Sequence, residues 1–98
     1  MQYVIAVFRS RNETLYLANM FKTRGVIVGV INTPKEAGQA CGISVRFDEK
    51  FLPMARQFLT SKPFRSFYGF FRVKTLDFNH RIVERISWFD MYFYCSLQ

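Results

Sequence analysis

One of the two cysteines in this 98-residue chain lies in the segment that is richest in chemical signals. That segment reads Thr33-Pro34-Lys35-Glu36-Ala37-Gly38-Gln39-Ala40-Cys41-Gly42 and separates an apolar run from an alternating one. A cysteine thiolate is a strong nucleophile, and a turn can present it to a reaction partner. Cys41 is therefore the first candidate for chemistry.

The residues before Cys41 predict how it is positioned. Thr33 can cap a helix, Pro34 fits the first helical position, and Glu36 can complete a capping box. We therefore expect a short helix that carries Cys41 at its end, with Gly42 in the left-handed conformation that lets a strand leave at once.

A reactive Cys41 would need help to ionise. A free cysteine has a pKa of about 8.5, and the dipole at a helix C-terminus disfavours the thiolate. Lys35 or Arg46 would have to compensate. The alternative is that Cys41 is a buried small hydrophobe in a turn.

The spacing of apolar residues predicts the order of elements. Apolar or alternating runs predict strands over residues 3–8, 26–32, 43–47 and 67–76, with a bulge at Gly69. Ser10 and Glu13 form a second capping box before a helix that Gly25 ends, and Asp48 can cap a helix over residues 49–61. The resulting order, β-α-β-β-α-β, is the ferredoxin-like α+β arrangement.

We expect two parts in this chain, a core domain over residues 1–76 and a C-terminal extension over residues 77–98. Ile82, Ile86, Phe89 and Phe93 recur at spacings of four, three and four, which predicts a helix in the extension. Twelve Phe, five Tyr and one Trp exceed what so small a core readily absorbs. We therefore expect a homo-oligomer whose contact residues are Trp88, Phe89, Tyr92 and Phe93.

Composition narrows the setting. A formal charge of +7 favours encounter with anionic partners. The cysteines form no paired motif, the start predicts no signal peptide, and no apolar run is long enough to cross a bilayer. These features predict a cytoplasmic protein without membrane attachment.

The same segments resemble a known family. Phe8-Arg9-Ser10, Thr33-Pro34-Lys35-Glu36 and the run from Cys41-Gly42 to Phe47 are similar to the pattern of the putative Se/S carrier protein-like family over residues 3–76. The resemblance implies that Cys41 holds a persulfide or selenopersulfide, received from a desulfurase-type donor and passed to an acceptor protein. The residues implied to support it are Thr33, Pro34, Lys35, Glu36, Gly42 and Arg46.

Other functions compete with this interpretation. A noncatalytic adaptor would use the aromatic extension, and a nucleic-acid module would use Arg65, Tyr68, Phe70, Arg72 and Lys74. Cys95 could act as a resolving thiol for Cys41, although its aromatic neighbours indicate packing instead. We expect no metal site, no cofactor and no classical enzyme chemistry, because His80 is the single histidine and the cysteines are isolated.

Overall fold

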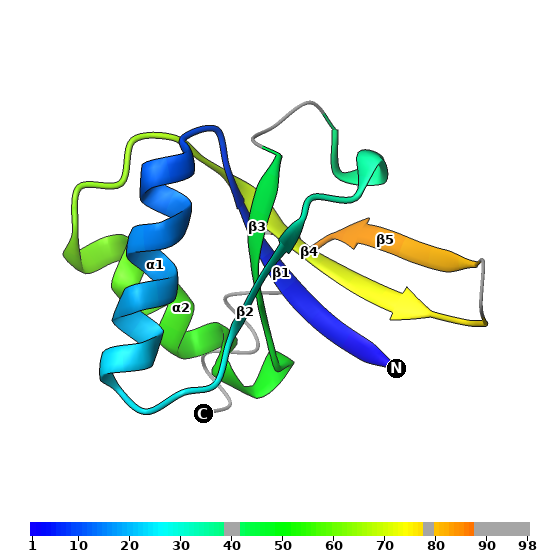
Figure 1. Cartoon of the computed structure of the whole chain (residues 1–98), viewed down its shortest axis with the longest axis horizontal. Helices are drawn as coiled ribbons and strands as arrows, with labels where there is room; N and C mark the ends of the chain where they lie inside the picture. The colour runs from blue at the N-terminus through cyan, green and yellow to red at the C-terminus, as the bar shows by residue number, and fades with distance from the viewer. Residues whose placement is uncertain (39–41, 78–79, 88–98) are drawn as a thin grey trace.

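The computed structural model describes residues 1–38, 42–77 and 80–87. These residues form a five-stranded antiparallel sheet with two α-helices on one face (Figure 1). The strands are β1 (Gln2–Phe8), β2 (Gly29–Asn32), β3 (Ile43–Phe47), β4 (Phe67–Thr75) and β5 (Arg81–Arg85). The helices are α1 (Arg11–Thr23) and α2 (Leu52–Ser61), with short 3₁₀ helices η1 (Lys35–Ala37) and η2 (Glu49–Phe51).

The strands lie in the order β2-β3-β1-β4-β5. With α1 between β1 and β2, and α2 between β3 and β4, the first six major elements follow the predicted β-α-β-β-α-β sequence. The fold therefore belongs to the predicted ferredoxin-like α+β class, with β5 added at one edge.

Strand β1 is the centre of the structure because it pairs with both β3 and β4. Its residues from Val4 to Phe8 are completely buried. Val4, Ala6 and Phe8 pack toward the helices, while Ile5 and Val7 belong to a second apolar cluster on the opposite face. This two-sided burial explains why the strand has a continuous apolar run rather than an alternating one.

Helix α1 begins and ends where the sequence predicts. The Ser10 hydroxyl accepts from the Glu13 backbone N–H at 3.3 Å, and Gly25 follows the helix with a φ of 76°. The predicted reciprocal half of the capping box is wrong, because the Glu13 carboxylate accepts instead from the backbone N–H groups of Arg65 and Ser66 and from the Ser66 hydroxyl. Glu13 thus fastens the start of α1 to the segment that enters β4.

The start of the second helical segment also follows the predicted pattern. Asp48 accepts from the Lys50 backbone N–H at 3.0 Å, and η2 precedes α2, with Pro53 in the first turn of α2. Glu49 of η2 forms an ion pair with Arg72 of β4, with N–O distances of 2.9 and 2.6 Å. This pair connects the helical layer to the sheet.

The predicted C-terminal helix is wrong for residues 81–85, because these residues form the strand β5. Val83 pairs with Val73 and is half-buried against the second apolar cluster, and Arg81 pairs with Thr75. The helix is predicted from the spacing of apolar residues, which does not show that the edge of β4 can hydrogen-bond to this segment. The adjacent β-branched residues Ile82 and Val83 also favour a strand. Phe89 and Phe93, which completed the helical spacing, lie outside the described residues.

Glu49 provides a test of the link between η2 and β4. Hydrogen bonds from Arg72 lower the pKa of Glu49 below its ordinary value of 4.5, against the opposing effect of burial. The carboxylate should therefore stabilise the fold fully above pH 4.5, and this contribution should be lost as pH falls through the lowered pKa. We predict that Glu49→Gln lowers the free energy of unfolding at pH 7 by about 1 kcal/mol.

Urea unfolding at pH 7 and at progressively lower pH measures this difference. A double-mutant cycle with Arg72→Gln isolates the pair from the other contacts of either residue. A coupling free energy that stays constant down to strongly acidic pH would contradict the assignment.

Candidate functional site

The connection between β2 and β3 carries the sequence-predicted site. Thr33 continues the ladder beyond β2, since its backbone N–H donates to the Gly42 carbonyl at 2.9 Å. Its hydroxyl lies 2.6 Å from the Ser44 hydroxyl oxygen. Thr33 and Gly42 therefore close the base of a connection that leaves the sheet and returns to it.

The predicted helix in this connection is shorter than expected and is not capped by Thr33. It is the 3₁₀ helix η1, which Pro34 precedes without a side-chain cap. Glu36 does not complete a capping box, because its carboxylate accepts two hydrogen bonds from Arg81 of β5, each at 3.0 Å. The Arg81 guanidinium lowers the pKa of Glu36 and ties η1 to the opposite edge of the sheet.

Gly38, rather than Gly42, ends this helix. Gly38 has φ 93° and ψ −167°, a backbone conformation that is essentially restricted to glycine. A Cβ atom at Gly38 would lie 2.8 Å from the Tyr68 hydroxyl oxygen, so the backbone passes directly over that side chain. Gly42, by contrast, has open space around its Cβ position.

The connection is held down on the sheet face that the helices leave uncovered. Ala37 is buried against Ile5, Val7, Phe71 and Val73. Figure 1 shows η1 on the side of the sheet away from α1 and α2. The residues that immediately precede Cys41 in the described chain are thus packed against the sheet.

Tyr68 reaches this position through a β-bulge. The pairing of β1 with β4 shifts between Val7, which faces Gly69, and Phe8, which faces Phe67. Tyr68 therefore has no direct partner in this register, and its ring joins the uncovered face. The sequence predicts a bulge at Gly69, and the unpaired residue is its neighbour Tyr68, while Gly69 itself pairs with Val7.

Two guanidinium groups lie beside the Tyr68 ring. The guanidinium carbon of Arg85 lies 4.7 Å from the ring centre, and that of Arg9 lies 5.6 Å away. Arg85 also donates to the Tyr68 carbonyl at 2.8 Å, and it crosses β4 at Gly69, where a Cβ atom would meet its guanidinium. Cation–π contact of this kind orients Arg side chains without neutralising them.

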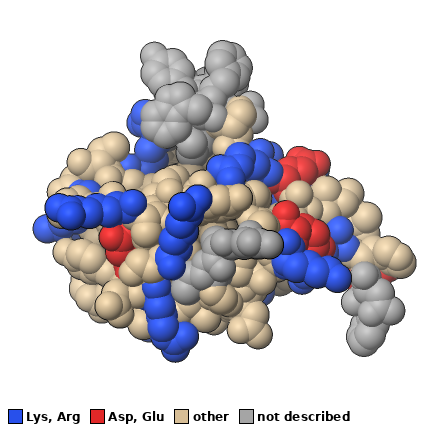
Figure 2. All heavy atoms as spheres, turned by 90° about the horizontal axis from the view of Figure 1, so that it is seen from above, with Lys and Arg blue, Asp and Glu red and all other residues tan. Residues whose placement is uncertain are grey.

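The surface around the connection is rich in cations. Figure 2 shows Lys and Arg side chains spread over the face seen from above, among fewer Asp and Glu side chains. Glu36, the acidic residue of η1, forms an ion pair with Arg81. The local charge pattern therefore favours an anion near the Tyr68 side chain.

Lys35 and Arg46, the two cations that the sequence indicates, lie on different elements. Lys35 is an exposed residue of η1. Arg46 lies three residues along β3 from Ile43, which at a strand rise of about 3.3 Å per residue is roughly 10 Å away. Its guanidinium carbon lies 4.1 Å from the Tyr3 ring centre.

Several predicted residues lie outside the described part of the chain. They are Cys41 and Cys95, together with the predicted contact residues Trp88, Phe89, Tyr92 and Phe93. The described chain places the residues on both sides of Cys41, namely Gly38 and Gly42.

The residues proposed for nucleic-acid stacking do not share one face. Phe70 is buried in the cluster beneath the helices, whereas Tyr68 belongs to the cluster on the other face. Arg72 is engaged with Glu49. The alternation in β4 and its bulge thus divide this set between two surfaces.

Sequence reasoning missed Gly38, Tyr68, Arg9 and Arg85 as neighbours of the connection. The sequence pattern indicates Tyr68 only as a stacking residue for nucleic acid. A glycine shortly before the cysteine was a weak signal for close packing, but nothing in the spacing predicted which side chain it would meet. Arg9 and Arg85 are brought together by the pairing of β1 with β4 and of β4 with β5.

The family assignment follows from a match with the Putative Se/S carrier protein-like family over residues 3–67. This match spans the core from β1 to the start of β4, and the chain belongs to that family. No curated protein and no solved structure matches the chain.

Two further findings concern residues 1–38, 42–77 and 80–87. None of their helices is long and apolar enough to cross a membrane. No group of three or more His, Cys, Asp or Glu residues among them is arranged to hold a metal ion.

Gly38 offers a direct test of the packing at this connection. We predict that Gly38→Ala lowers the free energy of unfolding by about 1–3 kcal/mol, because alanine is strained at this φ and its Cβ meets Tyr68. Gly42→Ala is the matched control and should change stability by less than about 1 kcal/mol. Chemical denaturation measures both, and equal effects would show that Gly38 is not constrained by Tyr68.

Proposed function

We propose that the protein carries sulfur or selenium as a persulfide or selenopersulfide on Cys41. The observation that carries this proposal is the extent of the family match, which includes Cys41 and stops before Cys95. The family description names a carrier of these elements, and Cys41 is the one thiol within the matched residues. A cytoplasmic setting suits the proposal, because reducing conditions maintain a free thiol.

The transfer step requires a nucleophile and no net redox change. The Cys41 thiolate attacks the terminal sulfur of a donor enzyme's persulfide, forming a new S–S bond. The donor S–S bond breaks, and the donor cysteine leaves as a thiolate. Cys41 then bears the persulfide. In the second transfer an acceptor nucleophile attacks the outer sulfur and forms a bond to it, the S–S bond to Cys41 breaks, and Cys41 leaves as a thiolate. A selenopersulfide follows the same course with selenium as the outer atom.

The described residues support this role by fixing both sides of the cysteine. Thr33 holds the Gly42 side through its ladder hydrogen bond, while Ala37 and Gly38 pack on the sheet at the other side. Pro34 is buried, and Glu36 anchors η1 to β5. These contacts hold the two described ends of the connection.

The transfer step also requires that Cys41 ionises to its thiolate, and nearby cations favour this form. Arg85 and Arg9 lie beside Tyr68, against which Gly38 packs three residues before Cys41. Lys35 is close in sequence, whereas Arg46 lies on Tyr3. We propose that Arg85 and Arg9 contribute more to thiolate formation than Arg46.

Alkylation kinetics test this electrostatic assignment. Arg85→Gln should slow the reaction of Cys41 with iodoacetamide at pH 7 by roughly two- to fivefold, the factor that about 0.5–1 kcal/mol of screened charge interaction gives. The measurement is made in a Cys95→Ser background, so that one thiol reacts. Arg46→Gln is the matched control, and a larger effect there would reverse the assignment.

Loading of the protein tests the function itself. The wild-type protein is incubated with a cysteine desulfurase and either cysteine or selenocysteine, and intact mass is measured before and after reduction. We predict a reducible gain of one chalcogen atom, retained in Cys95→Ser and lost in Cys41→Ser. Loading of Cys41→Ser, or no loading of wild-type protein by an active desulfurase, would overturn the proposal. Circular dichroism establishes that both variants are folded.

A further inference from the structure

The two edges of the sheet differ in how they are protected. Three of the five residues in the edge strand β5 are charged, namely Arg81, Glu84 and Arg85. Charged side chains on an edge discourage pairing with another sheet. The opposite edge strand, β2, has no charged residue.

The uncharged edge extends beyond β2. Residues 25–34 include no charged side chain and form the longest uncharged stretch of a chain with a net charge of +7. Ile27, just before β2, is 93% exposed, and Val30 within it is 41% exposed. Within the described residues these apolar side chains lie beside backbone groups without a strand partner, an arrangement that folded proteins usually avoid.

The register of β2 identifies which backbone groups face outward. Thr33 donates to Gly42, its direct partner in the ladder, so Gly29, Ile31 and Thr33 direct their backbone groups toward β3. Antiparallel geometry then directs the N–H and C=O groups of Val30 and Asn32 away from the sheet. The outward N–H and C=O groups of Val30 can therefore form hydrogen bonds with another strand, and Val30 can lie opposite the same residue of that strand.

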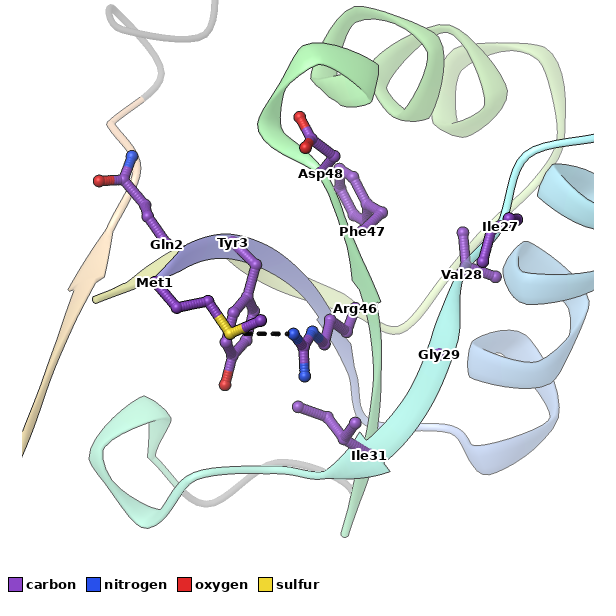
Figure 3. A pocket seen from close by; sticks show the side chains of 10 residues that line it. All are labelled: Met1, Gln2, Tyr3, Ile27, Val28, Gly29, Ile31, Arg46, Phe47 and Asp48. Atoms are coloured by element: carbon purple, nitrogen blue, oxygen red, sulfur yellow. Dashed lines mark hydrogen bonds between the residues drawn. The ribbon is translucent and has the colours of Figure 1, made fainter. Parts of the chain in front are cut away.

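A groove adjoins this edge and is lined by residues from the start of β1, from β2 and from the end of β3. It has a volume of about 400 Å³, and β2 contributes Gly29 and Ile31 to its lining. Figure 3 shows Ile31 and Arg46 pointing into it from neighbouring strands. A Cβ atom at Gly29 would touch only Ile31, at 4.0 Å, so the space above Gly29 is open.

We propose that β2 pairs with the β2 of a second copy in an antiparallel, two-fold symmetric homodimer. With Val30 of each copy opposite the other, Gly29 of one copy faces Ile31 of its partner across the axis. The partner's Ile31 then occupies the open space above Gly29, and the reverse contact is made at the same time. One sheet runs through both copies.

The self-complementary register favours a second copy as the occupant, since Gly29 and Ile31 of each copy face Ile31 and Gly29 of the other. Charge opposes the approach of two molecules of net charge +7, but this cost is smallest at the uncharged stretch 25–34. A two-fold axis at Val30 makes the surface its own complement, as an isologous interface requires. This inference does not depend on Cys41, so it stands or falls separately from the carrier function.

Analytical ultracentrifugation of the full chain over a range of concentrations tests the dimer. The wild-type protein should sediment as a dimer, while Val30→Lys should raise the dissociation constant at least tenfold. Ile82→Lys on β5 is the matched control, since Ile82 is also 41% exposed, and it should leave the dimer unchanged. Ile27→Lys, at a more exposed position, should weaken the dimer if Val30→Lys does not fold.

The register has its own test in a Cys41→Ser, Cys95→Ser background. Paired residues at such a position have Cα atoms about 5.5 Å apart, within the range that a disulfide spans. Mild oxidation should therefore link two copies through Val30→Cys but not through Ile82→Cys. A monomeric wild-type protein, or equal effects of the β2 and β5 substitutions, would overturn the proposal. A monomer would also be the result if the edge binds a strand of a different protein instead of a second copy.

Discussion

Burial of β1 on both faces is the constraint on which the structure depends. Each large apolar side chain of this strand that leaves water contributes about 1.5–3 kcal/mol, provided that both faces are covered. The helices cover Val4, Ala6 and Phe8, and the sheet would otherwise leave Ile5 and Val7 open to solvent. The connection between β2 and β3 covers them from the other side, with Ala37 packed against the second cluster. The segment that leads to the candidate cysteine is therefore also a structural element of the core.

The bulge in β4 links this structural role to the candidate chemistry. Because of the bulge, Tyr68 has no direct partner on β1. The backbone of Gly38 passes close to the Tyr68 hydroxyl, and the guanidinium groups of Arg9 and Arg85 lie beside the Tyr68 ring. Gly69 permits the arrangement, because Arg85 crosses the strand where a side chain would stand. Among the described residues, packing on Tyr68 holds Arg9 and Arg85, together with a backbone hydrogen bond from Arg85, and neither forms an ion pair with an acid.

The sheet edges add a second kind of organisation. The hairpin of β4 and β5 ends the sheet with a charged strand, and Arg81 uses that strand to anchor Glu36 of η1. At the other end, β2 is uncharged and short. Both proposals concern the chain between α1 and β3. Strand β2 lies along the edge of the sheet, whereas η1, which precedes Cys41 in the sequence, packs over the sheet.

The sequence by itself determined the elements whose signals are local. The cap at Ser10 and the end of α1 at Gly25 follow from the sequence because their interacting residues lie within a few positions of one another. The strands β1 and β3 follow from their apolar residues, although Ser44 of β3 is buried. The choice of Cys41 as the candidate residue also came from its local surroundings and from the family resemblance.

Only the tertiary structure decided the partners of Glu13, Thr33 and Glu36, and the strand formed by residues 81–85. Glu36 meets Arg81 across 45 positions, and Glu13 meets Ser66 across 53. Such contacts offer stronger partners than the local caps that the sequence predicted, and they exist only after the strands have paired. The cations beside Tyr68 are of the same kind, since a bulge and two strand pairings bring them together. Local spacing reports what a segment can form alone, whereas long-range pairing decides which of its polar groups are used.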